Sequence, residues 1–148
     1  MEESLSKIGW KAMLTMGMYT LVLSLFWIFV TEIMFVSDFE AYVGTSYSDY
    51  LLVDRRMAEL YIMTKKMIGL MLCGIAISIV IITHHGYKKG EKWAWFTLLV
   101  IGGIPWLTFI IYKIIIGYIG VSMIIFALGA ALYVIGIALP AKEILGNK

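Results

Sequence analysis

Long apolar runs alternate with short polar segments along this chain, and the pattern predicts helices that cross a membrane. A helix needs about 20 apolar residues to span the hydrocarbon core of a bilayer. Four stretches approach or exceed this length, at residues 12–36, 67–83, 93–112 and 121–140. We therefore predict an all-α, polytopic membrane protein whose single transmembrane domain, residues 1–148, is a four-helix bundle.

The connections between these spans differ in length and character. Residues 37–66 form a long loop, and its end, "LLVDRRMAELYIMTKK", has a helical pattern with Arg55 and Glu59 as an i,i+4 ion pair. Residues 113–120, "KIIIGYIG", are expected to make a tight turn at the membrane interface. The first span is longer than the core of a signal peptide and lacks a clean small-x-small cleavage site, so we interpret it as retained.

Composition agrees with a lipid environment. Hydrophobic residues make up 61% of the chain and charged residues 15%, whereas a soluble domain has about 45–50% and about 25%. A soluble protein of 148 residues could not bury so much apolar surface. The net charge of +2 gives no reason to expect nucleic acid, and no cofactor motif is recognisable, so no cofactor is expected.

The distribution of lysine and arginine predicts the orientation. Four spans put both termini on one side, together with the turn at residues 84–92. That side holds seven of the twelve basic residues and the other side five, and basic residues favour the cytoplasmic face. We therefore expect a multi-pass protein of the cell membrane with both termini in the cytoplasm and the loop at residues 37–66 outside.

The turn between the second and third spans reads "HHGYKKGEKWAWF" and carries the candidate chemistry of this side. Trp93 and Trp95 are expected to be anchors at the level of the headgroups, where amphipathic rings gather. His84 and His85 permit two hypotheses, an interfacial pair that responds to pH or a metal or proton-relay site. Neighbouring residues on a helix point about 100° apart, which disfavours joint binding of one metal ion.

The string "GEKWAW" in this turn resembles a pattern, G-[ER]-[KR]-W-A-W, of small four-helix integral membrane proteins from archaea and bacteria. In those proteins the basic turn stands between the second and third spans and a proline follows in the third, as Pro105 does here. The resemblance covers about residues 60 to 110. It implies the fold and topology and brings no activity with it.

Polar residues near the other side are candidates for an ion pair or a ligand site. Glu32 is the one acidic residue within an apparent span, and such residues are costly in lipid. It is expected to pair with a cation of the loop or with Lys113, or else to bind a proton or ligand. Arg55 and Arg56 could hold a phosphate or carboxylate, or could be a solvated helix face.

Small residues predict where helices approach closely. The candidate packing positions are Gly74 and Ser78 in the second span and Gly120, Ala127, Ala131 and Ala138 along the fourth. Large side chains beside the fourth-span strip are expected to face lipid or a partner subunit. Pro105, which follows two glycines, predicts a kink or local unwinding in the third span.

The sequence favours one function, and two alternatives are kept beside it. The first is a non-catalytic accessory or structural subunit of a larger membrane complex, for instance a respiratory or membrane-monooxygenase assembly. Its partners would be membrane lipids and other membrane subunits or further copies of the chain. The second is a small-molecule or ion carrier that acts as an oligomer, and the third is a membrane enzyme of the sterol-isomerase kind.

Overall fold

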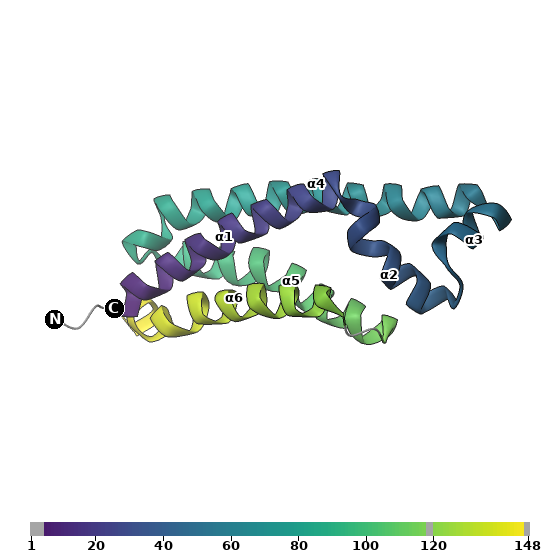
Figure 1. Cartoon of the computed structure of the whole chain (residues 1–148). Coiled ribbons are helices and arrows are strands. Elements are labelled where there is room, and N and C mark those ends of the chain that lie inside the picture. The colour runs from purple at the N-terminus through teal and green to yellow at the C-terminus, as the bar shows by residue number, and fades with distance from the viewer. Residues whose placement is uncertain (1–4, 118–119, 147–148) are drawn as a thin grey trace.

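The protein is a long helical bundle (Figure 1), described here from a computed structural model that covers residues 5–117 and 120–146. Within these residues every regular element is a helix. The elements are α1 (Leu5–Phe29), α2 (Thr31–Val43), α3 (Tyr47–Val53), α4 (Arg55–His85), the short 3₁₀ helix η1 (Tyr87–Lys89), α5 (Lys92–Ile116) and α6 (Val121–Gly146).

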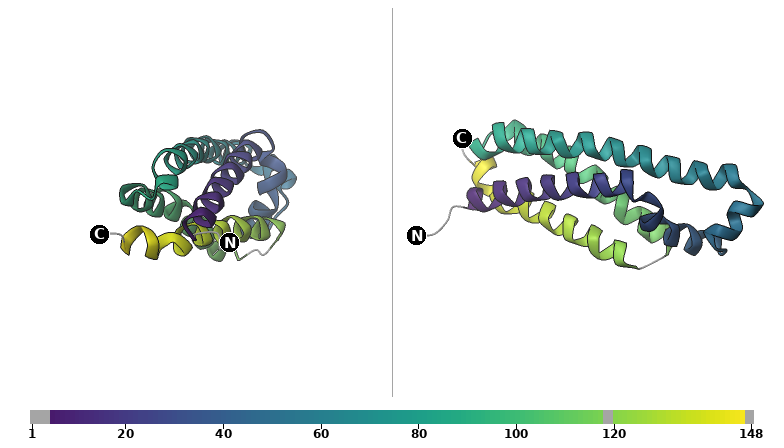
Figure 2. Two further views of the ribbon diagram at one scale, coloured as in Figure 1. Left: turned by 90° about the vertical axis from the view of Figure 1, so that its left-hand side faces the viewer. Right: turned by 45° about the horizontal axis from the view of Figure 1, so that its top comes forward.

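Four of these helices are long and apolar enough to cross a membrane, which confirms the predicted all-α, four-span bundle. The candidate spans are Leu5–Phe29, Arg55–Lys89, Lys92–Ile116 and Ser122–Gly146. The start of α1, the end of α6 and the turn at residues 86–91 lie at one end of the bundle, here called the terminal end (Figures 1 and 2). The opposite end carries α2 and α3 and is called the loop end.

The predicted bounds of the first span are wrong. Helix α1 begins at Leu5 and ends at Phe29, because Val30 leaves the helical conformation (φ −124°, ψ 29°) and a new helix begins at Thr31. The Thr31 hydroxyl donates to the carbonyl of Trp27 across this break. Helix α2 then turns away from α1 and crosses the loop end (Figure 1), so Glu32 belongs to this connecting helix and not to a span.

Helix α4 is longer than a bilayer requires. Its 31 residues correspond to roughly 46 Å at the rise of an α-helix, against about 30 Å of hydrocarbon. Of the extension predicted for residues 51–66, residues 55–66 are part of α4, whereas residues 51–53 belong to α3. The Asp54 side chain caps α4 by accepting from the amide of Met57 (3.1 Å). Part of α4 is therefore expected to extend beyond the hydrocarbon.

The core runs along the bundle and becomes aromatic towards the loop end. Trp27 is 4.6 Å from Phe35 and 5.3 Å from Phe109, measured between ring centroids, and Phe109 stacks on Phe126 at 5.1 Å. All four rings are buried. This layer joins α1, α2, α5 and α6 and forms the floor on which the polar residues of the loop end lie.

Glycines allow the closest helix approaches, but they are not the small residues expected from the sequence. A Cβ at Gly129 would overlap the indole of Trp106, and one at Gly69 would lie 2.8 Å from the Cβ of Trp27. Gly136 packs similarly against Met13. These glycines are therefore among the residues that let helices approach closely within the described chain.

The predicted packing strip faces outward in this chain. Ala127, Ala131 and Ala138 are exposed and Gly120 is half-buried. In α4, Gly74 is exposed with no atom within 4 Å of an added Cβ, and the hydroxyl of Ser78 bonds to the Gly74 carbonyl. The small size of a residue therefore did not show which face of α6 is directed into the bundle. The inner face is marked by Gly129, because the large side chain of Trp106 fills the space beside it.

Pro105 does not interrupt its helix. Helix α5 is continuous from Lys92 to Ile116, so the predicted local unwinding does not occur. Gly102 and Gly103, which precede the proline, lie against the ring of Tyr133, whose hydroxyl donates to the Leu99 carbonyl (2.7 Å). The two glycines therefore make room for a side chain of α6.

Candidate functional site: a charged cluster and its pocket at the loop end

A carboxylate is buried at the loop end because of the pattern of α2. The residues of α2 that face the bundle are Thr31, Phe35, Asp38 and Phe39, which share one side of a helix at this spacing. Asp38 is 1% exposed. A buried carboxylate is costly unless it is paired and hydrogen-bonded, and the neighbouring helices supply its partners.

Lys113, in the last turn of α5, is the main partner of Asp38. Its Nζ lies 2.6 and 2.7 Å from the two carboxylate oxygens, and it also donates to the hydroxyl of Ser122 in α6 (2.6 Å). The Tyr112 hydroxyl donates to the same carboxylate at 3.2 Å. These bonds tie α2, α5 and α6 together in a buried ion pair.

Lys65 is a second buried cation beside this pair. Its side chain comes from α4 and its Nζ lies over three rings, 4.0 Å from the centroid of Tyr112, 5.1 Å from Phe35 and 5.2 Å from Tyr61. Lys65 is 8% exposed. Among the described residues, no ion pair or hydrogen bond reaches its ammonium group.

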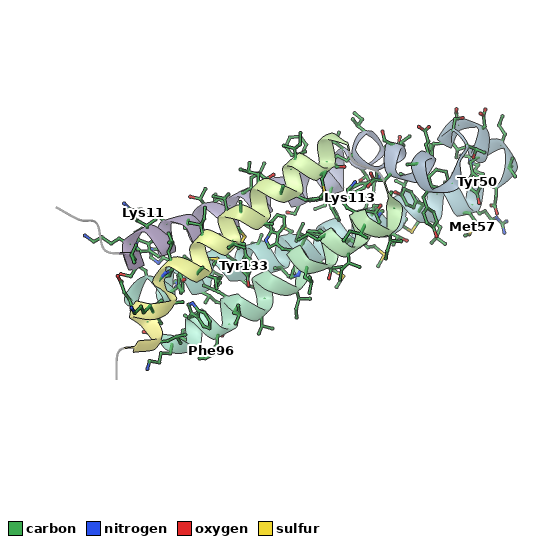
Figure 3. All side chains as sticks on the ribbon, turned by 90° about the horizontal axis from the view of Figure 1, so that it is seen from below. Lys11, Tyr50, Met57, Phe96, Lys113 and Tyr133 are labelled. Atoms are coloured by element: carbon green, nitrogen blue, oxygen red, sulfur yellow. The ribbon has the colours of Figure 1, made fainter. Side chains whose placement is uncertain are left out.

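A pocket of about 550 Å³ opens beside Lys65 and Asp38, within the usual size range of small-molecule sites. Tyrosines 42, 50, 61 and 112 and apolar residues line most of it. The apolar wall consists of Phe39, Val43, Met57, Leu60, Ile115 and Ile116. Figure 3 shows Lys113 towards the bundle and Tyr50 and Met57 towards the tip of the loop end.

Aromatic contacts give the pocket a firm wall. Phe39 makes edge contacts with Tyr47, Tyr50 and Tyr61 at 5.1 to 5.3 Å, and the Tyr61 hydroxyl donates to the Phe35 carbonyl at 3.1 Å. Burial, together with the charges of Glu32 and Glu59, raises the pKa of Tyr47. Its hydroxyl therefore stays protonated and donates to the Ala58 carbonyl (3.3 Å).

The predicted pairing of Glu32 with Lys113 is wrong, because Lys113 is bound to Asp38. Glu32 is exposed and, with Lys66, lines a separate cavity of about 230 Å³. No ion pair of Glu32 occurs among the residues that the structure describes. The expected Arg55–Glu59 pair is confirmed at 2.7 Å, and it is exposed, as is Arg56.

The turn at the terminal end separates its aromatic residues. Trp93 is exposed, as expected of an interfacial anchor, but Trp95 is buried and donates to the Ile137 carbonyl (3.0 Å), so its predicted role as an anchor is wrong. His84 and His85 are exposed with ring centroids 5.2 Å apart. Across residues 5–117 and 120–146, no group of three metal-ligating side chains forms.

Sequence reasoning missed the residues that form the cluster. Asp38 was placed in the external loop without a role, Lys65 was considered only as one of the loop cations that could pair with Glu32, and Tyr112 and Ser122 had no assigned role. The signal that could have found Asp38 is its position between Phe35 and Phe39, on the side of α2 that a helical repeat would bury.

Comparison with known proteins assigns no function to this cluster or to its pocket. No family model, no curated protein and no solved structure matches it.

Proposed function

We propose that this protein is a membrane-embedded binding protein that holds one small amphipathic molecule in the pocket at the loop end. The observation that carries the proposal is the pocket of about 550 Å³ in which a largely apolar wall surrounds a buried ammonium group, that of Lys65. Binding sites commonly combine apolar walls with a few polar groups that fix orientation.

The position of the pocket favours a molecule that partitions into membranes. We place the loop end, with its charged residues, at the boundary between hydrocarbon and water, where the head of an amphiphile also lies. Met57 and Leu60 are each 52% exposed on α4 while they line the pocket. A hydrocarbon chain could therefore lie against these two side chains while its head meets Lys65.

A sterol-isomerase type of reaction has less support than binding. Such an enzyme needs intramembrane carboxylates around a cavity, and Asp38 is the carboxylate among the described residues that line this pocket. Both of its oxygens accept from Lys113. A role as a carrier would use the same pocket as its binding site, so the binding proposal includes the first step of transport.

Filling the pocket tests the proposal. We expect native mass spectrometry of the protein from mild detergent to show one retained amphiphile per chain. Leu60→Trp should lower the occupied fraction several-fold, because the indole takes the space of the ligand. Met63→Trp is the matched control: Met63 is 57% exposed on the same helix and does not line the pocket. Equal retention in both variants would refute binding at this place.

The second candidate is an accessory subunit of a larger membrane complex. The exposed alanines of α6, Ala127, Ala131 and Ala138, favour it, because small residues on an outer face permit close approach of another helix. This function is compatible with a bound amphiphile, and it makes a separate prediction about assembly.

Enlarging one of these alanines tests the subunit function. Ala131→Leu should leave the thermal midpoint of the isolated chain unchanged, because Ala131 faces outward, but it should release the chain from its complex in blue-native electrophoresis. Ile124→Leu, at a position 72% exposed on the same helix, conserves volume and should retain assembly. If the wild-type protein migrates without other polypeptides, the second candidate fails.

We also propose that the terminal end faces the cytoplasm of the cell, with the loop end outside. The excess of basic residues at the terminal end supports this orientation. In a Cys73→Ala background, Thr45→Cys should react with an impermeant maleimide in intact cells and Lys89→Cys should not, since both positions are exposed but at opposite ends. The reverse labelling pattern would contradict it.

A further inference from the structure

We infer that the amphiphile bound at the loop end carries an anionic headgroup, a phosphate or carboxylate on a hydrocarbon chain, and that Lys65 binds this group. The inference rests on the proposed pocket and adds the chemical class of its ligand. It follows from the charge, the hydrogen-bonding state and the surroundings of Lys65.

The buried cluster has one more positive than negative charge. Asp38 supplies one carboxylate, and Lys113 and Lys65 each supply an ammonium group. Lys113 is matched to Asp38 by contacts of 2.6 and 2.7 Å, so the pair is neutral. Lys65 remains as a net positive charge, and one anion would balance it.

The ammonium group of Lys65 also has its hydrogen-bond donors unused. An ammonium group has three donors, and within the described part of the chain none of them has an acceptor. Contacts with the faces of Tyr112, Phe35 and Tyr61 favour the charged form. The face of a ring attracts the cation but provides no lone pair that accepts a hydrogen bond. An oxygen anion would provide both the attraction and the hydrogen-bond acceptor.

Three hydroxyl groups that line the pocket with Lys65 are already engaged, which leaves Lys65 as the cationic donor for a headgroup. The Tyr112 hydroxyl donates to Asp38, that of Tyr61 to the Phe35 carbonyl, and that of Thr64 to the Leu60 carbonyl (2.8 Å). Lys113 lies deeper and is bound to Asp38 and Ser122. The ligand therefore meets Lys65 from the pocket.

The walls select an amphiphile over a free anion. Much of the pocket wall is apolar, with side chains such as Leu60, Ile115 and Ile116, which offer no hydrogen bond to the other oxygens of a free phosphate ion. A hydrocarbon chain gains from contact with the same side chains. Head and chain together match the two kinds of surface that this pocket presents.

The neighbouring lysine provides a matched control. Lys66 follows Lys65 on α4 but is exposed and lines the separate cavity beside Glu32. Lys65→Met removes the charge and keeps an unbranched apolar side chain over the rings. Lys66→Met removes the same charge from the same turn of the helix without altering the pocket.

The experiment is a titration of the delipidated full chain in mild detergent, followed by native mass spectrometry. The probes are phosphatidylglycerol and phosphatidylcholine with identical chains, and inorganic phosphate as competitor. We expect wild type to bind one phosphatidylglycerol about tenfold more tightly than phosphatidylcholine, a difference of about 1.4 kcal/mol. Lys65→Met should abolish this preference and keep phosphatidylcholine binding, which also reports an intact pocket.

Lys66→Met and Lys65→Arg should both retain the preference, because each leaves a cation at position 65. Equal binding of the two lipids by wild type, or an unchanged preference in Lys65→Met, would overturn the anionic headgroup while leaving the pocket in place. Loss of phosphatidylglycerol in the presence of equimolar phosphate would overturn the amphiphile. Failure of wild type to bind either lipid would refute the proposed function itself.

If Lys65→Met does not fold, Lys65→Gln and Lys65→Arg decide the matter between them. Both can donate hydrogen bonds, but the arginine is charged and the glutamine is neutral. Preference for phosphatidylglycerol in the arginine variant and not in the glutamine variant supports a headgroup bound by charge. Equal behaviour of the two variants contradicts it.

Discussion

Replacing Lys113 by methionine is expected to lower the free energy of unfolding by about 3–5 kcal/mol, as removal of one partner of a buried ion pair does elsewhere. Asp38 would remain 1% exposed without its cation, and α2 would lose its principal tie to α5 and α6. The measurement is thermal or denaturant unfolding of the protein in mild detergent, followed by circular dichroism.

The reciprocal and double variants separate charge from shape. Asp38→Leu alone should also destabilise, because it leaves Lys113 unmatched, whereas Asp38→Leu combined with Lys113→Met should be more stable than either single variant. Lys92→Met, at an exposed position of the same helix, should have little effect. Additive losses in the double variant would mean that the two side chains do not act as a pair.

Gly129→Ala should be the most disruptive change of a single methyl group in the bundle. The added Cβ would overlap the indole of Trp106, which is 4% exposed and packs against Phe109 at 5.7 Å between centroids. Overpacking of this kind costs about 1–3 kcal/mol, occasionally more. We expect a loss at the upper end of that range, measured by the same unfolding assay.

Gly74→Ala is its control, with the opposite expected sign. Gly74 is exposed in the middle of α4 and nothing lies within 4 Å of an added Cβ, so alanine should stabilise by about 0.5–1 kcal/mol through the entropy of the unfolded chain. If Gly74→Ala destabilises as much as Gly129→Ala, the outward direction of Gly74 is in error, and if Gly129→Ala is tolerated, the packing of α6 on Trp106 is in error.

The four spans could be predicted because lipid imposes them. Every backbone polar group in hydrocarbon must be satisfied within the helix, so a sufficiently long apolar stretch is evidence for a span. Short connections then make consecutive spans antiparallel neighbours. The Arg55–Glu59 pair was equally predictable, because the contact is local. Both predictions rest on one helix at a time.

What failed needed knowledge of two helices at once. Trp95 and Trp93 have the same local signal, and only the position of α6 decides that Trp95 is buried. Ala131 and Gly129 are both small, and the ring of Trp106 on another helix decides which one faces inward. The end of α1 at Phe29 was missed because apolar residues continue into α2, where they pack across the loop end and do not span.

The polar cluster was missed for a related reason. Asp38 and Lys65 lie in a segment, residues 37–66, whose mean polarity predicts contact with water. Its length and its tyrosines did not indicate that it folds against the end of the bundle. Lys113 was recognised as a candidate cation, but the nearest acidic residue within an apparent span, Glu32, was taken as its partner. Asp38 lies six positions after Glu32, and the break at Val30 redirects both.

The bond between Asp38 and Lys113 also imposes an order on the folding steps that occur during synthesis. Asp38 leaves the ribosome 75 residues before Lys113, which at about 5–20 residues per second is a delay of roughly 4–15 s. During that interval α1 and α4 can already form a hairpin, while the carboxylate of Asp38 has no ammonium partner from α5 and must remain hydrated. The loop end can close over its pocket only after the third span has arrived.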